Sequence, residues 1–270
     1  MRLQTIIFFV VIILLIIVVM YYVKKDIGTV TGIVSAETAQ TIPASTLQTS
    51  SSTATDVNFT YYCWFYIDDW TYNYGKRKIL FARMSADPNT GSSGGTPPIT
   101  YFSVDLDNTL NDLSISIRLN CGDKQSDNVA CQTSGKLDIN KSFLKTFYIP
   151  QIAIQNWNLI LCTSNGSSLD CYLNGKLSNT FILPSTIFQG NSGEVSNSSI
   201  YITPLLPQNG TQAGFSGWTS KFSYKAKTVD PEMAWKIYTK GYGGSMLSNM
   251  NYKVSLSVIN GSQTVSSVSL

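Results

Sequence analysis

Residues 6–23 form an uninterrupted apolar run, IIFFVVIILLIIVVMYYV, that contains no charged residue, proline or glycine. A helix satisfies its own backbone hydrogen bonds in lipid, and a helix of this run would extend about 27 Å, close to the ~30 Å hydrocarbon core of a bilayer. Two tyrosines end the run, where amphipathic rings favour the lipid–water interface, and two lysines follow them. The run from Ile6 to Val23 therefore predicts a single transmembrane helix within an N-terminal anchor of residues 1–26.

A cleaved signal peptide is the alternative interpretation of the same run. Arg2 supplies a positive charge before it, but the run exceeds the ~7–15 apolar residues usual for such peptides, and no A-x-A-like site follows closely. An uncleaved anchor is therefore favoured. Lysine and arginine lead by two to one on the C-terminal flank, which favours a cytoplasmic large domain, although one charge leaves the orientation open.

The composition excludes several classes of function. Charged residues make up 13% of the chain, its formal net charge is +3, and no basic stripe stands out, so nucleic acid is not expected as a partner. The chain has no histidine, which excludes a Ser-His-Asp or Cys-His catalytic arrangement and a histidine-ligated zinc or iron site within it. These features favour a non-enzymatic protein without a cofactor.

Four of the five cysteines bracket two short polar loops. Cys121 and Cys131 bracket the first loop, and Cys162 and Cys171 bracket the second, which contains an Asn-Gly turn signal. We expect two local disulfides, with Cys63 left unpaired. The alternative is five reduced thiols packed as small apolar side chains, as is usual in the cytosol.

The chain after the anchor divides into three parts by composition. Residues 27–56 are rich in Ser, Thr and Ala, and they predict a flexible tether with an r.m.s. span of roughly 30 Å. Residues 57–260 carry a β pattern, and residues 261–270 predict a frayed tail. The expected organisation is thus a β domain held beside a membrane by a tether.

Short β-type segments separated by turn residues fill the region from residue 57 onward. The run FTYYCWFYI after Asn58 is dense in aromatic and β-branched residues, as in a central strand. One helix is predicted at Pro231–Thr239, with Asp230 as its N-cap and Gly241 at its end. This pattern predicts an all-β sandwich or barrel. Further strands are expected at Lys78–Arg83, Thr100–Asp105, Leu113–Asn120, Ser142–Ile149, Asn156–Thr163, Leu169–Leu173, Asn179–Leu183, Ser199–Pro204, Ser216–Lys225 and Tyr252–Ile259.

A hairpin is predicted over residues 157–175, and its turn chemistry sets its register. With residues 166–167 at the tip, Cys162 faces Cys171, and directly opposed positions lie within the range that a disulfide needs. An Asn-Gly pair at residues 174–175 makes the next tight turn.

This hairpin resembles the laminin-G-like branch of the concanavalin A-like lectin/glucanase superfamily. In that branch a Trp opens one strand, and an aliphatic–Tyr–x–Asn/Asp–Gly sequence ends the next. An opening strand with Trp64 and a closing strand with its helix agree, so the resemblance covers residues 57–242 and implies a jelly-roll sandwich of two antiparallel sheets that serves binding or structure. The residues that carry it are Trp157, Asn165, Gly166, Tyr172, Asn174, Gly175, Phe215–Trp218, Phe222, Tyr224, Asp230–Met233, Ile237, Tyr238 and Gly241.

Some members of this superfamily hydrolyse glycans with an E-x-D-x-x-E set, which this sequence lacks. The tight acidic pairs are Asp68 with Asp69 and Asp105 with Asp107, and we expect solvated carboxylates there rather than the ~5–5.5 Å pair of a retaining glycosidase. A D-x-D-x-D-G calcium loop is absent as well, so no metal is expected. An unusual glycan-active enzyme is the least favoured hypothesis.

The loop DDWTYNYGK carries three aromatic residues, Trp70, Tyr72 and Tyr74. They could form a platform for a glycan or protein partner, and the alternative is packing beneath a strand crossover. Three other tryptophans are expected in the core: Trp64, Trp157 and Trp235.

The stretch TYYCWFYIDDWTYNYGKRKILFAR also resembles membrane-anchored proteins of large double-stranded DNA viruses, some of which are virion components. This implies a single-pass membrane protein, such as a minor capsid protein, whose jelly roll links the virion membrane to a capsid protein or another partner. The alternative is a cell-surface or lumenal glycan-binding adhesin. Six N-x-S/T sequons occur, and those at Asn165 and Asn209 lie in predicted turns, where glycosylation would accompany the lumenal alternative.

Overall fold

The structure is a computed structural model that describes residues 32–47, 57–88, 98–121, 142–189, 195–243, 255–260 and 263–269. It divides into a unit of residues 27–242 and a second unit of residues 1–26 and 243–270. The predicted span at residues 6–23 lies outside the described residues. None of the helices in the described ranges combines the length and the hydropathy that a membrane crossing needs.

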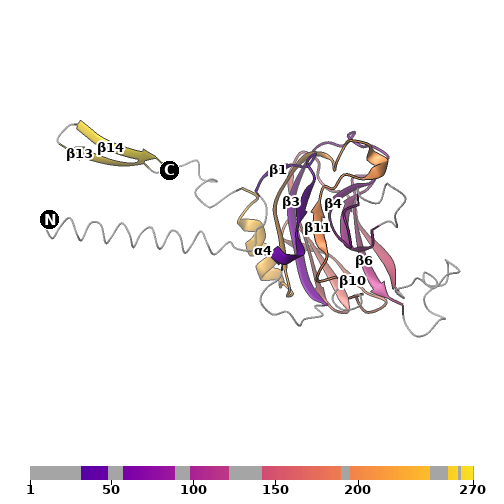
Figure 1. The fold of residues 1–270 in the computed structure, drawn as a ribbon. Coiled ribbons are helices and arrows are strands. Elements are labelled where there is room, and N and C mark those ends of the chain that lie inside the picture. Colours follow the sequence, from indigo (N-terminus) through magenta and orange to yellow (C-terminus); the bar gives the residue numbers. More distant parts are fainter. Residues whose placement is uncertain are drawn as a thin grey trace. The chain divides into compact units, whose positions relative to one another are not determined.

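The larger unit is a sandwich of two six-stranded sheets in which neighbouring strands are antiparallel (Figure 1). The prediction of an all-β fold with two antiparallel sheets is confirmed. Sheet A has the order β1 (Val34–Ser35), β12 (Ser216–Lys225), β3 (Asn58–Asp69), β8 (Trp157–Asn165), β9 (Ser168–Leu173) and β10 (Lys176–Ile182). Sheet B has the order β2 (Gln40–Ile42), β11 (Ser199–Ile202), β4 (Lys78–Met84), β5 (Thr100–Leu106), β6 (Leu113–Asn120) and β7 (Ser142–Ile149). The helices among the described residues are short: α2 (Ala44–Leu47), the 3-10 turn η2 (Pro207–Asn209) and α4 (Pro231–Thr239).

Strand β3 is buried on both of its faces. Its odd-numbered residues from Phe59 to Ile67 enter the core between the sheets. Its even-numbered Tyr62 and Trp64 belong to a second apolar cluster on the outer face of sheet A. Successive side chains of a strand point to opposite faces, so a strand covered on both sides has an almost continuous apolar sequence. This explains why FTYYCWFYI forms a central strand.

Helix α4 covers the outer cluster of sheet A and has the predicted bounds. The carboxylate of Asp230 caps its first turn by accepting a hydrogen bond of 2.7 Å from the backbone N–H of Met233. Ala234 and Ile237 are buried against the sheet. The helix therefore covers the apolar outer surface that Tyr62 and Trp64 of β3 form.

The three tryptophans expected in the core have different environments. Trp64 is 3% exposed, but it lies in the outer cluster beneath α4 rather than between the sheets. Trp157 is partly buried against the same cluster. Trp235 is 46% exposed, so its assignment to the core is wrong. Ala234 faces the sheet, and the next residue of a helix lies about 100° further around the axis.

The predicted tether of residues 27–56 is wrong for part of its length. Strand β1 pairs with β12, and strand β2 pairs with β11, so each adds an edge to one sheet. Ala36 and Ile42 are buried in the core. Strand edges carry unpaired backbone N–H and C=O groups that any extended segment can satisfy, and a Ser/Thr-rich segment does so here without a period-2 apolar pattern.

The second unit contains a two-stranded antiparallel hairpin of β13 (Ser255–Asn260) and β14 (Gln263–Ser269). The predicted frayed tail at residues 261–270 is thus a strand over most of its length. The jelly-roll domain was predicted at residues 57–260. The sandwich instead begins before residue 57, with β1, and the unit that contains it ends at residue 242.

Candidate functional site

The three aromatic residues predicted as a platform lie in the loop between β3 and β4, but they are not equally available. Trp70 packs against the core, its indole Nε1 lies 3.4 Å from the carbonyl oxygen of Thr109, and Nζ of Lys78 lies 4.9 Å from its ring centre. Tyr72 is partly buried, and burial raises its pKa. Tyr74 is 59% exposed. Trp70 is therefore a packing residue, and a partner contact stays a prediction mainly for Tyr74.

Two of the acidic residues considered for chemistry stabilise the turns beside them. Asp69 accepts hydrogen bonds of 2.8 Å from the backbone N–H and the hydroxyl of Thr71, and these bonds lower its pKa. Asp107 accepts hydrogen bonds of 2.9 Å from the backbone N–H groups of Leu110 and Thr109, which lower its pKa as well. The carboxylate oxygens of Asp69 and Asp107 thus accept hydrogen bonds that stabilise the adjacent turns.

Asp105 is buried, and the expectation of a solvated carboxylate is wrong for it. Its Oδ2 lies 2.7 Å from the guanidinium of Arg77, and burial raises its pKa despite this partner. Asp68 is exposed. Within the described ranges, no three Cys, Asp or Glu side chains gather closely enough to hold a metal ion.

The cysteines have the predicted register but not the predicted bond. Cys162 lies directly opposite Cys171 in the β8–β9 pair. Both thiols are free and buried, with their Sγ atoms 3.7 Å apart, so the predicted disulfide between them is wrong. The contact with Cys162 and burial raise the pKa of Cys171, which keeps the thiol protonated and unreactive. Cys63 is also a free, buried thiol, as predicted for the unpaired cysteine.

The second predicted disulfide joins Cys121 and Cys131. Cys131 lies outside the described residues, and Cys121 is not among the free thiols. This pair therefore stays a prediction.

The two sequons in predicted turns differ in their access to solvent. Asn165 is exposed at the β8–β9 turn. Asn209 is 3% exposed, and its amide Nδ2 donates a hydrogen bond of 2.9 Å to the backbone carbonyl of Arg77. In the folded sandwich, glycosylation therefore remains open at Asn165 and is blocked at Asn209.

One apolar surface of the sandwich is a row of three aromatic rings on the outer face of sheet A. Trp218 of β12 pairs with Tyr66 of β3, and Tyr66 pairs with Trp157 of β8. The ring centres are 5.5 Å apart for Trp218 and Tyr66 and 5.7 Å apart for Tyr66 and Trp157. With Ile33, these rings line a shallow hollow of about 250 Å³. We call Ile33, Tyr66, Trp157 and Trp218 the aromatic shelf.

The shelf remains open because α4 covers only part of the outer face. Tyr62 and Trp64 lie beneath the helix, whereas Tyr66 is partly exposed further along the same strand. Trp218 is 41% exposed and Ile33 is 52% exposed. Single exposed apolar side chains are common, whereas a contiguous exposed apolar patch is typical of an interaction site.

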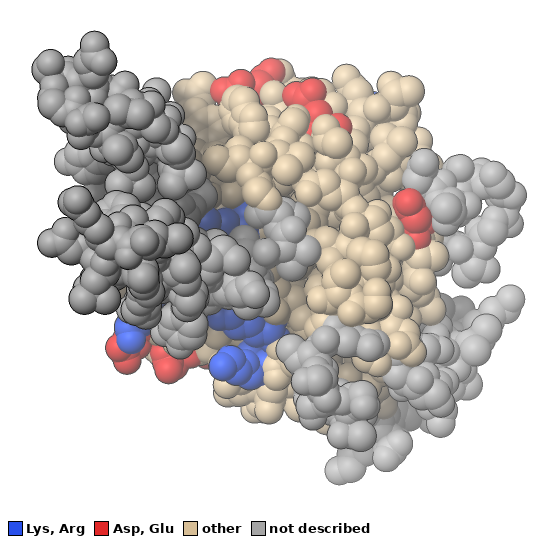
Figure 2. Space-filling model, turned by 60° about the vertical axis from the view of Figure 1, so that its left-hand side comes forward, with Lys and Arg blue, Asp and Glu red and all other residues tan. Residues whose placement is uncertain are grey.

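A ring from outside the sheets extends the row of aromatic side chains. Tyr242, which follows α4, stacks on Trp157 with a centroid distance of 4.1 Å and an interplanar angle of 9°. Figure 2, in which the left-hand side of Figure 1 comes forward, shows a described surface that is mostly uncharged, with acidic side chains at the top, at the right and at the lower left and basic side chains near the centre and lower left. The shelf therefore suits a flat, largely apolar partner surface.

The sequence contained a signal for this surface. The alternation that places Tyr62 and Trp64 outward also places Tyr66 outward, and Trp157 opens the first strand of the predicted hairpin. The pairing of that strand with β3 was not predicted. The neighbouring position of Trp218 depends on the pairing of β12 with β3, which the sequence pattern does not specify.

No protein-family model matches this sequence, and no curated protein matches it significantly. Solved structures that resemble it include the binding domain of botulinum neurotoxin serotype D/C, with a TM-score of 0.47 and 14% identity over 77% of this chain and 43% of that one. The receptor-binding domain of botulinum neurotoxin type G gives a TM-score of 0.44 and 13% identity over 78% of this chain and 47% of that one. The chain spans less than half the length of either structure, and similarity at this level says nothing of what it binds.

Proposed function

We propose that this chain is a non-enzymatic, single-pass membrane protein whose β-sandwich binds a partner through the aromatic shelf. The observation that carries the proposal is the row of Trp218, Tyr66 and Trp157 on three adjacent strands, open to solvent on an outer face. Tryptophan and tyrosine supply much of the binding energy of protein interfaces, because they bury large apolar areas at a low entropic cost. The laminin-G-like resemblance, which implies binding or structure, agrees with this role.

The apolar run at residues 6–23 supports the membrane location. About ten residues separate its end from Ile33 of the shelf, and an extended chain of that length reaches at most about 35 Å. A connection this short supports a partner that belongs to the same membrane or lies near it.

The partner that we favour is a structural protein of a virion, so that the chain links an internal membrane to a capsid shell. The resemblance of residues 60–83 to membrane-anchored proteins of large double-stranded DNA viruses supports this setting. The second candidate is a lumenal or cell-surface adhesin that binds glycans. The open aromatic rings of the shelf and the exposed sequon at Asn165 favour that alternative.

Membrane fractionation of the full chain tests the anchor. The protein should sediment with membranes and resist carbonate extraction, whereas a variant lacking residues 1–26 should be released. Release of the full chain by carbonate would refute the anchor.

Site-specific photo-crosslinking in the native particle or membrane tests the shelf. A photoreactive amino acid in place of Trp218 should give a defined crosslinked product. The matched control is the same substitution at Tyr148 of sheet B, which is 58% exposed and lies away from the shelf in sequence and sheet. Equal products from both positions would contradict a specific role of the shelf.

A glycan array and a peptide-N-glycosidase mobility assay separate the two candidates. Saturable glycan binding lost on Trp218→Ala, together with a mobility shift lost on Asn165→Gln, would select the adhesin. The absence of both glycan binding and a mobility shift would favour the structural link.

A further inference from the structure

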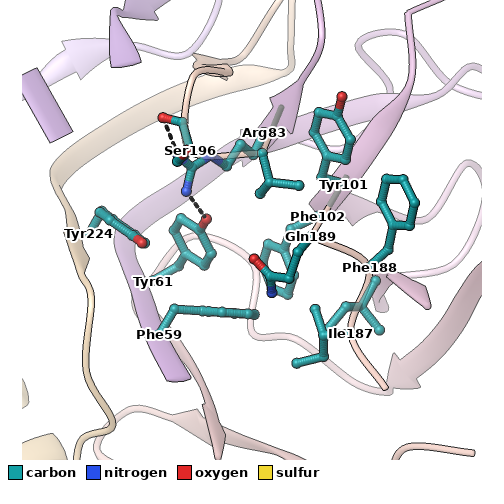
Figure 3. Close-up of a pocket in the computed structure, with 12 residues that line it drawn as sticks. Phe59, Tyr61, Arg83, Tyr101, Phe102, Ile187, Phe188, Gln189, Ser196 and Tyr224 are labelled. Carbon is teal, nitrogen blue, oxygen red and sulfur yellow. Dashed lines mark hydrogen bonds between the residues drawn. The ribbon is translucent and has the colours of Figure 1, made fainter. Parts of the chain in front are cut away.

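A buried arginine that is not part of the aromatic shelf lies between the two sheets. Arg83 of β4 is 5% exposed. Its Nε donates to the hydroxyl of Ser198 at 3.0 Å. Its two terminal nitrogens donate to the hydroxyl of Tyr61 and the carbonyl of Ser196, each at 3.2 Å (Figure 3). The ring of Tyr224 lies 5.1 Å from its central carbon. In the part of the chain that the structure describes, no carboxylate makes an ion pair with it.

Among the residues that the structure describes, the contacts of Arg83 are with neutral groups. Removing a cation from water costs several kcal/mol unless an anion and hydrogen bonds compensate it, so such groups are usually paired. The hydroxyl of Tyr61 does not supply the negative charge, because burial raises its pKa to about 12. The guanidinium thus lacks a counter-charge within the described fold.

A cavity of about 40 Å³ borders the guanidinium. A single water needs roughly 10–15 Å³, so the space accepts a group larger than one water. Its walls are mostly apolar, and they include Phe59, Phe102, Ile117 and Ile187. The side chains of Arg83, Tyr61 and Gln189 lie around the same space (Figure 3). Of the lining residues, Gln189 is partly buried and Ser196 is exposed, so both retain contact with solvent.

We propose that this cavity binds a single carboxylate carried on an apolar or aromatic stem. One buried positive charge matches one negative charge, and charge-assisted hydrogen bonds from a guanidinium to a carboxylate are stronger than those to neutral oxygens. The amide of Gln189 adds a donor for the second oxygen, and the phenylalanine and isoleucine walls accept the stem. The site is separate from the aromatic shelf, so it goes beyond the proposed function and does not depend on it.

Titration calorimetry with the full chain in detergent micelles tests the site, with 3-phenylpropionate as the probe and 3-phenylpropionamide as its neutral counterpart. The acid should bind saturably, and the amide should bind about tenfold or more weakly, since it lacks the charge. Phosphate and sulfate should compete poorly, because the walls favour an apolar stem. Binding of acid and amide with equal affinity, equal binding of inorganic anions, or no binding at all would overturn the proposal.

Two variants connect the binding to this cavity. Arg83→Gln removes the charge and should abolish binding, but its burial makes the folding of this variant uncertain. Val195→Trp keeps the arginine and fills the space at a partly buried lining position, so it should also abolish binding. The matched control is Ile182→Trp, which is 81% exposed on β10 and should bind as the wild type does. Undiminished binding by a folded Val195→Trp protein would place the ligand elsewhere and refute the assignment.

Discussion

The turn between β9 and β10 supports helix α4, and replacing its glycine by alanine measures how closely the two pack. Gly175 has a φ of +77°, and a Cβ added to it would lie 2.7 Å from Cβ of Tyr238 and 3.0 Å from Cε3 of Trp235. Gly75, in the loop between β3 and β4, has a φ of +72°, and a Cβ added there would meet nothing within 4 Å. The two glycines thus share a backbone conformation and differ in their surroundings.

The expected magnitudes follow from this difference. An L-residue in the left-handed region costs about 1–2 kcal/mol, so Gly75→Ala should lower the free energy of unfolding by that amount. Gly175→Ala carries the same backbone cost and also forces an atom against the helix, and such overpacking adds about 1–3 kcal/mol. In a domain of this size, 1 kcal/mol shifts Tm by about 2–4 °C, so Gly175→Ala should unfold about 2–12 °C below Gly75→Ala.

Urea unfolding monitored by tryptophan fluorescence gives both free energies of unfolding, and a double-mutant cycle assigns the excess. In a Tyr238→Gly background, most of the additional cost of Gly175→Ala should disappear, because this substitution removes both Cβ and Cγ of Tyr238, whereas alanine would keep the Cβ that lies nearest. Equal losses of stability in Gly75→Ala and Gly175→Ala would refute the close packing of α4 on this turn.

Three further predictions concern the helix cap, the thiols and one carboxylate. Asp230→Ala removes the hydrogen bond to Met233, so urea denaturation should show a loss of about 1 kcal/mol, and an unchanged midpoint would contradict the cap. The buried Cys162 and Cys171 should react with Ellman's reagent only after unfolding, and rapid reaction of the native protein would disprove their protection. Hydrogen bonds lower the folded-state pKa of Asp107, so its contribution to stability is present above the ordinary carboxyl pKa and is lost as the pH falls through the lowered value. Between about pH 5 and pH 2, the wild type should therefore lose stability more steeply than Asp107→Asn in thermal melts, and parallel curves would argue against this linkage.

The elements that the sequence predicts well are those with local signals. Strands Leu113–Asn120, Ser142–Ile149 and Ser216–Lys225 and helix Pro231–Thr239 have the predicted bounds. The register that places Cys162 opposite Cys171 also follows from turn chemistry, because a tight turn sets the register of the two strands that it joins.

The elements that the sequence misses depend on partners far along the chain. Strands β1 and β2 lie in a Ser/Thr-rich segment, and their partners β12 and β11 follow more than a hundred residues later. Strand formation there depends on the available sheet edges rather than on the segment's own pattern. In the same way, the bond predicted between the two facing cysteines is absent because register brings thiols together without oxidising them.

The candidate sites show the same division. For the aromatic residues in the loop after β3, a partner platform and packing beneath a strand crossover were the two alternatives, and Trp70 packs inward. The open row forms where Trp218, Tyr66 and Trp157 meet on three strands. The buried charge of Arg83 could not be anticipated, because KILFAR reads as an ordinary strand ending in a polar residue.

The amino-acid sequence by itself determined the apolar N-terminal run, the all-β class, most strand positions and the capped helix, because each depends on neighbouring residues and on periods of two or 3.6. The tertiary structure alone decided which strands lie side by side, which outward rings α4 covers, and which polar side chains become enclosed. Those outcomes depend on hydrogen-bonded pairing and packing between segments that are distant in the chain, and no local pattern encodes them.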